Sequence, residues 1–196
     1  MILNILHDGD EILKKLSCSV ILDDEIRDMI EDGTGSNSIS GQKVQFTRIN
    51  SLDLSLISLI QGSKTAAVFT QNIFSAAPVI VAKNHLNSNV KALLINSGNA
   101  NAGTGQKGLE ACLKTCEIFA GKLDINSDQI LPFSTGVIGQ LLSLEPFEKN
   151  TEKLVDSLSS SNMSDVSKGI LTTDLVEKSC SISFAINGNN VTLSGI

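Results

Sequence analysis

Residues 90–121 read VKALLINSGNANAGTGQKGLEACLKTCEIFAG and carry the clearest structural signal in this chain. The apolar run over 90–95 is typical of a buried strand. Residues 106–120 repeat apolar side chains at helical spacing, and the predicted helix has a single apolar stripe formed by Leu109, Cys112, Leu113, Cys116, Phe119 and Ala120. Gly121 is the expected stop of this helix. The stretch therefore predicts a strand, a loop and a helix in direct succession.

The loop between them, residues 96–105, contains three glycines and three asparagines. This composition indicates left-handed backbone positions or a close approach of two backbones. The loop is no Walker A motif, because Gln106-Lys107-Gly108 stands where Lys-Ser/Thr is required, and it is no G-x-G-x-x-G loop. A loop before a helix can also direct its N–H groups at a ligand. From the residues alone, a structural turn and a ligand-binding loop are equally open.

The remaining segments predict a mixed α and β protein with layered architecture. Alternating or short apolar runs predict strands at 44–47, 52–60, 66–70 and 130–133. A helix is expected after an N-cap at Ser143, with Pro146 in its first turn. Residues 76–86 fit a strand or a helix equally well. Alternation at 182–193 around Asn187-Gly188 predicts a hairpin.

Composition excludes several functional classes. The 196 residues are enough for one domain, or two at most, and 41% hydrophobic with 18% charged residues is typical of a folded core. A net charge of −6 and 4% aromatic residues argue against a nucleic-acid partner. No apolar run approaches the about 20 residues that a membrane helix needs. The N-terminus does not resemble a signal peptide, so we expect a cytoplasmic protein.

Cysteine and histidine usage narrows the chemistry further. The four cysteines form no C-x-x-C pair and only two histidines are present, so we expect no metal and assign the cysteines as buried and reduced. Two histidines also leave little basis for a Ser-His-Asp or Cys-His mechanism. We expect His85 at an element end or at the surface.

Two short segments offer hydroxyl groups beside glycine or carboxylate. In residues 133–139, Thr135-Gly136 in a sharp turn would present a hydroxyl and an N–H side by side, as an oxyanion hole requires, although an ordinary glycine turn is the commoner role. In residues 169–174, the side chains of Thr172, Thr173 and Asp174 could bind a polar substrate or end a helix.

These segments, in this order, resemble the bifunctional ornithine acetyltransferase / glutamate N-acetyltransferase family. The similarity runs from about Ser51 to Ile196. It rests on collinear stretches at residues 52–54, 67–72, 76–79, 96–105, 134–139 and 172–174. The asparagine-glycine block is the most distinctive of them.

The resemblance implies an acyltransferase of arginine biosynthesis with a layered α/β/β/α sandwich completed by a second chain. Such a precursor cuts itself into α and β chains, and the new N-terminal threonine of the β chain is the nucleophile, activated by its own amino group. It passes an acetyl group from N-acetylornithine, or from acetyl-CoA as co-substrate, to glutamate. The oxyanion donors fall on Thr135 and Gly136, and a substrate-contacting threonine falls on Thr172 or Thr173. The family implies no bound cofactor, a heterotetramer and autocatalytic cleavage.

Two departures from the family pattern bear on activity. The Lys-Gly-rich cleavage segment and the nucleophilic threonine do not follow Ser194-Gly195-Ile196, so we expect an α-chain portion that is inactive alone. The alternative is a non-catalytic binding or scaffold remnant of that enzyme. The usual Thr-Val-Pro-Lys after Thr-Thr-Asp is here residues 175–178, Leu-Val-Glu-Lys.

Residues 2–33 instead resemble the opening of bacterial peptide deformylases. The deformylase metal site is not carried over, because neither its Glu-Gly-Cys-Leu-Ser segment nor its His-Glu-x-x-x-His helix is present. The Gly/Ser-rich stretch 33–41 reads as a linker. We therefore expect an N-terminal arm with its linker over 1–41, loosely docked, and the acetyltransferase α-chain domain over 42–196.

Overall fold

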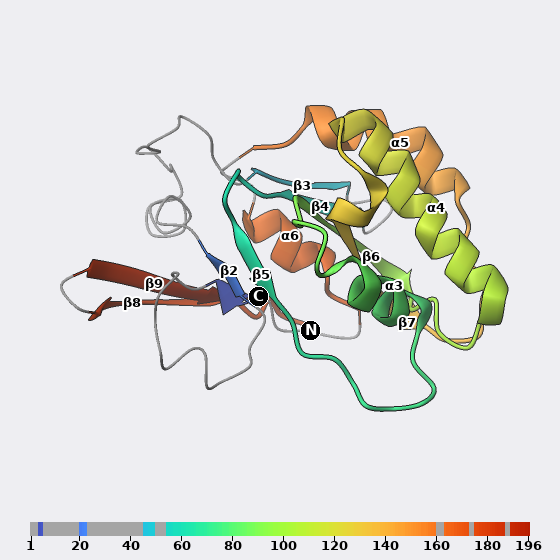
Figure 1. The fold of residues 1–196 in the computed structure, drawn as a ribbon, viewed down its shortest axis with the longest axis horizontal. Helices are drawn as coiled ribbons and strands as arrows, with labels where there is room; N and C mark the ends of the chain where they lie inside the picture. The colour runs from blue at the N-terminus through green and yellow to red at the C-terminus, as the bar shows by residue number, and fades with distance from the viewer. Residues whose placement is uncertain are drawn as a thin grey trace.

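A four-stranded sheet positions the candidate site. The computed structural model describes residues 4–5, 20–22, 45–49, 54–159, 163–172, 175–186 and 189–196 (Figure 1). This sheet has the order β3-β4-β6-β7 and consists of β3 (Gln45–Ile49), β4 (Leu54–Ser58), β6 (Ala92–Asn99) and β7 (Ile130–Val137). A second sheet has the order β5-β2-β1-β9-β8, with β1 (Asn4–Ile5), β2 (Val20–Leu22), β5 (Lys64–Ala66), β8 (Cys180–Ile186) and β9 (Asn189–Gly195). The helices are α3 (Ala77–His85), α4 (Gly105–Leu123), α5 (Glu145–Asp156), α6 (Met163–Gly169) and the 3₁₀ turn η1 (Ser127–Gln129).

The strands β6 and β7 run parallel along their whole length. Their register begins at Ala92 opposite Ile130 and ends at Asn99 opposite Val137. Parallel neighbours need a crossover, and α4 supplies it. The predicted strand at 90–95 thus continues through the first residues of the asparagine-glycine segment, because backbone pairing with β7 does not require apolar side chains.

The central strands β4 and β6 of the four-stranded sheet are buried on both faces. Ala92 and Leu94 of β6 pack in one core with side chains of α4 and α5, among them Cys116, Phe119 and Leu154. Leu93 and Ile95 pack in the other core with Val166 of α6 and with Ile196. In Figure 1, α4 and α5 lie side by side along one side of this sheet. A strand covered on both faces reads as a continuous apolar run, as 92–95 does. The layered, mixed α and β fold is confirmed.

Two predicted helix boundaries are wrong by a few residues. Helix α4 continues past Gly121 to Leu123, and Asp124 takes the left-handed backbone position that closes it, with φ of 55°. An aspartate tolerates this conformation because its short polar side chain can bond locally. Helix α5 begins after Leu144 and has no side-chain cap, so Ser143 is no N-cap, although Pro146 does lie in the first turn.

Three other predicted segments resolve clearly. The stretch 76–86 contains a helix, α3 (Ala77–His85), with Pro78 in its first turn. The strand predicted at 66–70 is wrong, because β5 ends at Ala66 and residues 67–70 have no regular structure. The C-terminal hairpin is confirmed, with Ile182 paired to Leu193.

The described part of the N-terminal arm consists of β1 and β2. β1 pairs with β2 and β9, and β2 pairs with β5, so the backbone of the arm shares a sheet with strands of the region 42–196. The Gly/Ser stretch 33–41 lies outside the described residues, and the division of the chain at residues 41 and 42 stays a prediction. Among the helices of the described ranges, none is both long and apolar enough to cross a bilayer.

Two glycines of α4 provide a matched test of this packing. A methyl group at Gly108 would lie 1.8 Å from Thr104 Oγ1 and 2.5 Å from Asn101 Oδ1, whereas a methyl group at Gly121 meets nothing within 4 Å. We predict that Gly108→Ala lowers the free energy of unfolding by about 1–3 kcal/mol through overpacking. Gly121→Ala should raise it by about 0.5–1 kcal/mol, because alanine favours the helix. Urea unfolding measures both, and equal effects of the two substitutions would contradict the packing.

Candidate functional site

The ends of β6 and β7 approach each other closely at two glycines. Gly136 lies opposite Gly98 with φ of 128°, and a Cβ atom on Gly136 would lie 2.3 Å from the Gly98 carbonyl carbon. Glycine is required here both for the backbone angle and for the close approach. Strand β7 contains Thr135 and Gly136 and is the last strand in the order of its sheet. The two residues thus belong to an edge strand and not to the sharp turn expected from the sequence.

Asn101 organises the loop that leads from β6 into α4. It is completely buried in the left-handed conformation, with φ of 45°. Its side-chain amide donates to the Gly108 carbonyl at 2.9 Å, and its Oδ1 accepts from Thr104 Oγ1 at 2.8 Å. Its backbone N–H donates to Asn99 Oδ1 at 2.7 Å. Asn101 thereby satisfies its polar groups inside the protein, which favours the structural-turn interpretation of residues 96–105.

The same loop is bonded to the end of β7. The Ala100 N–H donates to the Val137 carbonyl at 2.9 Å, and the Gly139 N–H donates to the Ala102 carbonyl at 2.8 Å. The asparagine-rich loop consequently fixes the position of the chain directly after Thr135 and Gly136.

Side-chain hydrogen bonds tie the two strands to each other and to α6. Ser134 Oγ donates to Asn96 Oδ1 at 2.6 Å across the β6–β7 pair. The buried Ser97 Oγ donates to the carbonyl of Gly169, the last residue of α6, at 2.5 Å. Residues 170–172 follow directly, so this bond brings Thr172 towards the strand ends.

A pocket of about 420 Å³ opens at this junction. Its wall combines β6, β7, α6 and the segments after α6, and its lining residues are Ile95, Phe133, Ser134, Thr135, Ser167, Ile170, Leu171, Thr172, Lys178 and Ile196. The structure thus brings together Thr135, which is half-buried, and Thr172, which is exposed. Gly136 is exposed and follows Thr135 without lining the pocket, and Thr173 lies outside the described residues.

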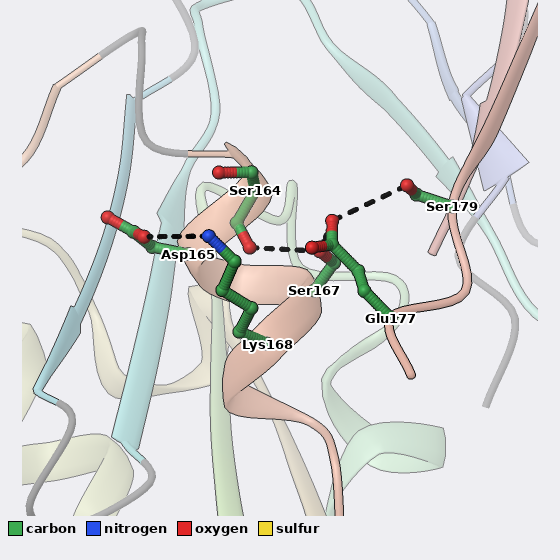
Figure 2. Close-up of polar contacts among 6 residues, drawn as sticks. All are labelled: Ser164, Asp165, Ser167, Lys168, Glu177 and Ser179. Atoms are coloured by element: carbon green, nitrogen blue, oxygen red, sulfur yellow. Dashed lines mark hydrogen bonds and ion pairs between the residues drawn. The ribbon is translucent and has the colours of Figure 1, made fainter. Parts of the chain in front are cut away.

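Sequence reasoning missed two polar residues of this wall, Ser167 and Lys178. Ser167 is buried in α6, and its Oγ bonds to the carboxylate of Glu177 and to the Ser164 carbonyl (Figure 2). Lys178 is the only charged side chain among the described residues that line the pocket. Its position four residues after Thr-Thr-Asp could have identified Lys178 as a residue of the pocket wall. The residues between them differ from the family pattern, and this difference hid the correspondence.

The buried cysteines are poor nucleophiles. Burial raises the pKa of the Cys116 thiol to about 12, and burial together with Cys116 raises the pKa of Cys112 further. Both groups are therefore thiols at neutral pH, and neither lines the pocket. His85 ends α3 as expected but is buried, not at the surface, and its Nδ1 lies 2.8 Å from the Ile130 carbonyl, which assigns the proton to Nδ1. Nowhere in the described ranges do three metal-ligating side chains cluster.

Comparison with solved structures defines the class of fold. The structure aligns with the arginine biosynthesis bifunctional protein argJ of Bacillus halodurans with a TM-score of 0.71 and 28% identity, over 79% of this chain and 85% of that one. It aligns with the ornithine acetyltransferase of Mycobacterium tuberculosis, solved with ornithine, with a TM-score of 0.69 and 23% identity, over 78% and 86% of the chains. The fold is that of the ornithine acetyltransferases.

Sequence comparison identifies the family. The ArgJ family model matches residues 38–196. The curated relatives named arginine biosynthesis bifunctional protein ArgJ from Pseudomonas syringae pv. tomato and Methylococcus capsulatus are 43% and 44% identical over 144 residues, 74% of this chain. The chain belongs to the ArgJ family, which confirms the resemblance drawn from the motifs. It spans about a third of the length of these relatives, 36% and 35% respectively.

Thiol alkylation tests the burial of the cysteines. At pH 8 in native buffer we predict rapid alkylation of the exposed Cys180 and at least ~100-fold slower alkylation of Cys112 and Cys116, because those two react only after local or global opening. Tryptic peptides 108–114, 115–122 and 179–196 separate the three sites for mass spectrometry. Unfolding in urea should make the rates similar, and similar rates in native buffer would contradict the structure.

Proposed function

We propose that this chain is the α-chain portion of an acetyltransferase that moves an acetyl group from N-acetylornithine to glutamate in arginine biosynthesis. Acetyl-CoA is a second acetyl donor in bifunctional members, and no bound cofactor takes part. The observation that carries the proposal is the shared pocket of Thr135 and Thr172, two motif residues that are 37 positions apart in sequence. Membership of the ArgJ family supports the reaction class.

The proposed reaction is an acyl transfer through an acetyl-threonine ester. The threonine hydroxyl oxygen of a companion β chain attacks the acetyl carbonyl, and its proton passes to the threonine's own α-amino group. The tetrahedral alkoxide then collapses, the carbon–nitrogen bond breaks, and ornithine leaves with that proton. The neutral amino group of glutamate then attacks the ester carbonyl and passes a proton to the α-amino group of the threonine. The second tetrahedral alkoxide collapses, the bond from the acetyl carbon to the threonine oxygen breaks, and that oxygen takes the proton back as N-acetylglutamate leaves.

Thr135 and Gly136 are the proposed donors to each alkoxide. Their place at the end of an edge strand supports this role, because alternate N–H groups of an edge strand point away from the sheet. Donors held by the surrounding fold need no reorganisation as the charge develops. The close approach of Gly136 to Gly98 and the bonds to Val137 and Gly139 provide that rigidity.

A companion chain is supported by the different shares of a solved chain and of a full-length curated relative that this chain matches. The match takes in 85% of the solved Bacillus halodurans chain but only 36% of the curated Pseudomonas relative. This difference is expected when the working protein consists of separate chains of which this chain corresponds to one. We propose an assembly of two such α chains with two β chains. The family match from residue 38 likewise supports a boundary between the N-terminal arm and the domain 42–196.

Reconstitution tests the proposed function. The full chain is co-expressed with a β chain that begins at the nucleophilic threonine of an ArgJ relative, and N-acetylglutamate formation from N-acetylornithine and glutamate is measured. We predict turnover by the pair and none by either chain alone. Thr135→Ala should lower kcat about 100- to 1,000-fold, since one oxyanion donor is lost. Thr135→Ser retains the hydroxyl and should recover most of that activity.

The controls separate this proposal from the non-catalytic alternative. A native ArgJ enzyme assayed in parallel shows that the conditions support turnover. Assembly or ligand binding by the pair without turnover would favour a binding or scaffold remnant, and wild-type rates in Thr135→Ala would exclude the oxyanion role.

A further inference from the structure

The pocket that contains Thr135 and Thr172 reaches the hydrophobic core at two apolar side chains, Ile95 of β6 and Phe133 of β7. The two residues lie opposite each other in the parallel register, so their side chains are neighbours on one face of the sheet. Ile95 is buried in the core, whereas Phe133 is half-buried and packs against it. We call these two side chains the inner end of the pocket.

Thr135 shares this face of the sheet with Phe133. The two are separated by one residue of β7, and side chains at this spacing point to the same side of a strand, with about 6.6 Å between their Cα atoms. Ser97 lies opposite Thr135, and its Oγ bonds to the Gly169 carbonyl at the end of α6. The Thr135 hydroxyl and the inner end therefore lie next to each other on the face that α6 covers.

We infer that Phe133 limits the length of the acyl group that this site transfers. The inference rests on the proposed function and deepens it. An acyl carbon whose oxygen accepts hydrogen bonds from Thr135 and Gly136 has three other substituents during the reaction. The attacking threonine oxygen comes from the companion chain, and the departing nitrogen must return to solvent. The direction that remains for the acyl chain is the inner end of the pocket.

The side chains at this end suit an alkyl chain. Ile95 and Phe133 carry no polar side-chain atoms, and the segment after α6 adds Ile170 and Leu171 to the pocket wall. The total volume of about 420 Å³ is typical of a small-molecule site, but it has to hold the amino-acid part of the substrate as well. The length of the acyl chain is thus decided locally, where the Phe133 ring closes the inner end.

Shortening Phe133 should therefore admit a longer acyl chain. Phe133→Ala removes the whole ring and opens space beyond the position of an acetyl methyl group, and Phe133→Leu removes less. One methylene group more or less in an apolar pocket changes kcat/KM by about 10- to 200-fold. Ile95 is less suitable for substitution because it is almost completely buried, at 2% exposure.

Phe69 provides a matched control. It is half-buried and packs against the same core as Phe133, but it does not line this pocket. Its ring centre lies 5.5 Å from Lys83 Nζ, in the segment before α3. Phe69→Ala removes the same atoms as Phe133→Ala, so an effect of lost packing is distinguishable from an effect on the acyl group.

The test uses the reconstituted pair of chains with N-acetylornithine or N-butyrylornithine as the acyl donor to glutamate, and kcat/KM is measured for each. With either donor, the bond from the acyl carbon to the ornithine nitrogen breaks and one to the glutamate nitrogen forms. The wild-type pair should prefer the acetyl donor. Phe133→Ala should raise the butyryl-to-acetyl ratio of kcat/KM at least about 10-fold. Phe133→Leu should raise this ratio less, and Phe69→Ala should leave it unchanged.

The outcomes distinguish this inference from the function on which it rests. Turnover by the wild-type pair with an unaltered ratio in the folded Phe133 variants would overturn the role of Phe133 alone. A wild-type preference for the butyryl donor, or an equal rise of the ratio in Phe69→Ala, would also overturn it. If Phe133→Ala does not fold, Phe133→Leu decides by the same ratio. No turnover by the wild-type pair, while a native ArgJ enzyme is active, would overturn the proposed function and this inference together.

Discussion

The parallel pairing of β6 with β7 is the constraint on which the site depends. The two strands stay in register to their last residues, where the backbone at Gly136 lies too close to Gly98 to leave room for a Cβ atom on residue 136. Asn101 then closes the connection into α4 with hydrogen bonds from both its side chain and its backbone. If the pairing ended earlier, Thr135 would belong to a free loop instead of an edge strand held in place.

From this strand pair, a short series of hydrogen bonds reaches the pocket. Ser97 links β6 to the last residue of α6, which brings Thr172 to the same hollow as Thr135. Ser167, two residues earlier in α6, holds Glu177 and thereby the segment that carries Lys178. Each link is a buried or half-buried serine, so each loses more by being left unsatisfied than it would at the surface. The pocket is built by tertiary contacts from four separate segments.

The sequence predicted the local elements well and the tertiary relations poorly. The apolar run at 92–95 and the stripe of α4 are visible because burial on two faces and on one face leave different periodicities. Leu113 was wrongly assigned to that stripe and is exposed. The continuation of β6 to Asn99 is not visible, because polar residues pair through their backbones without changing the pattern. The helix end at Asp124 in place of Gly121 reflects a left-handed backbone conformation at a non-glycine residue, which composition does not report. Thr135 and Thr172 were identified from the family motifs, whereas Ser167 and Lys178 depend on a contact between α6 and residues ten positions later.

The proposed function requires that one pocket between β7 and the segments after α6 receives the acetylated amino acid. Backbone amide chemical shifts of the isotope-labelled chain, in complex with its β chain and titrated with N-acetylornithine, test this most directly. We predict that the largest saturable shifts fall on residues 134–136, 170–172 and 178. Shifts confined to other surfaces, such as the hollow bounded by residues 141–147, or no saturable shifts, would contradict it.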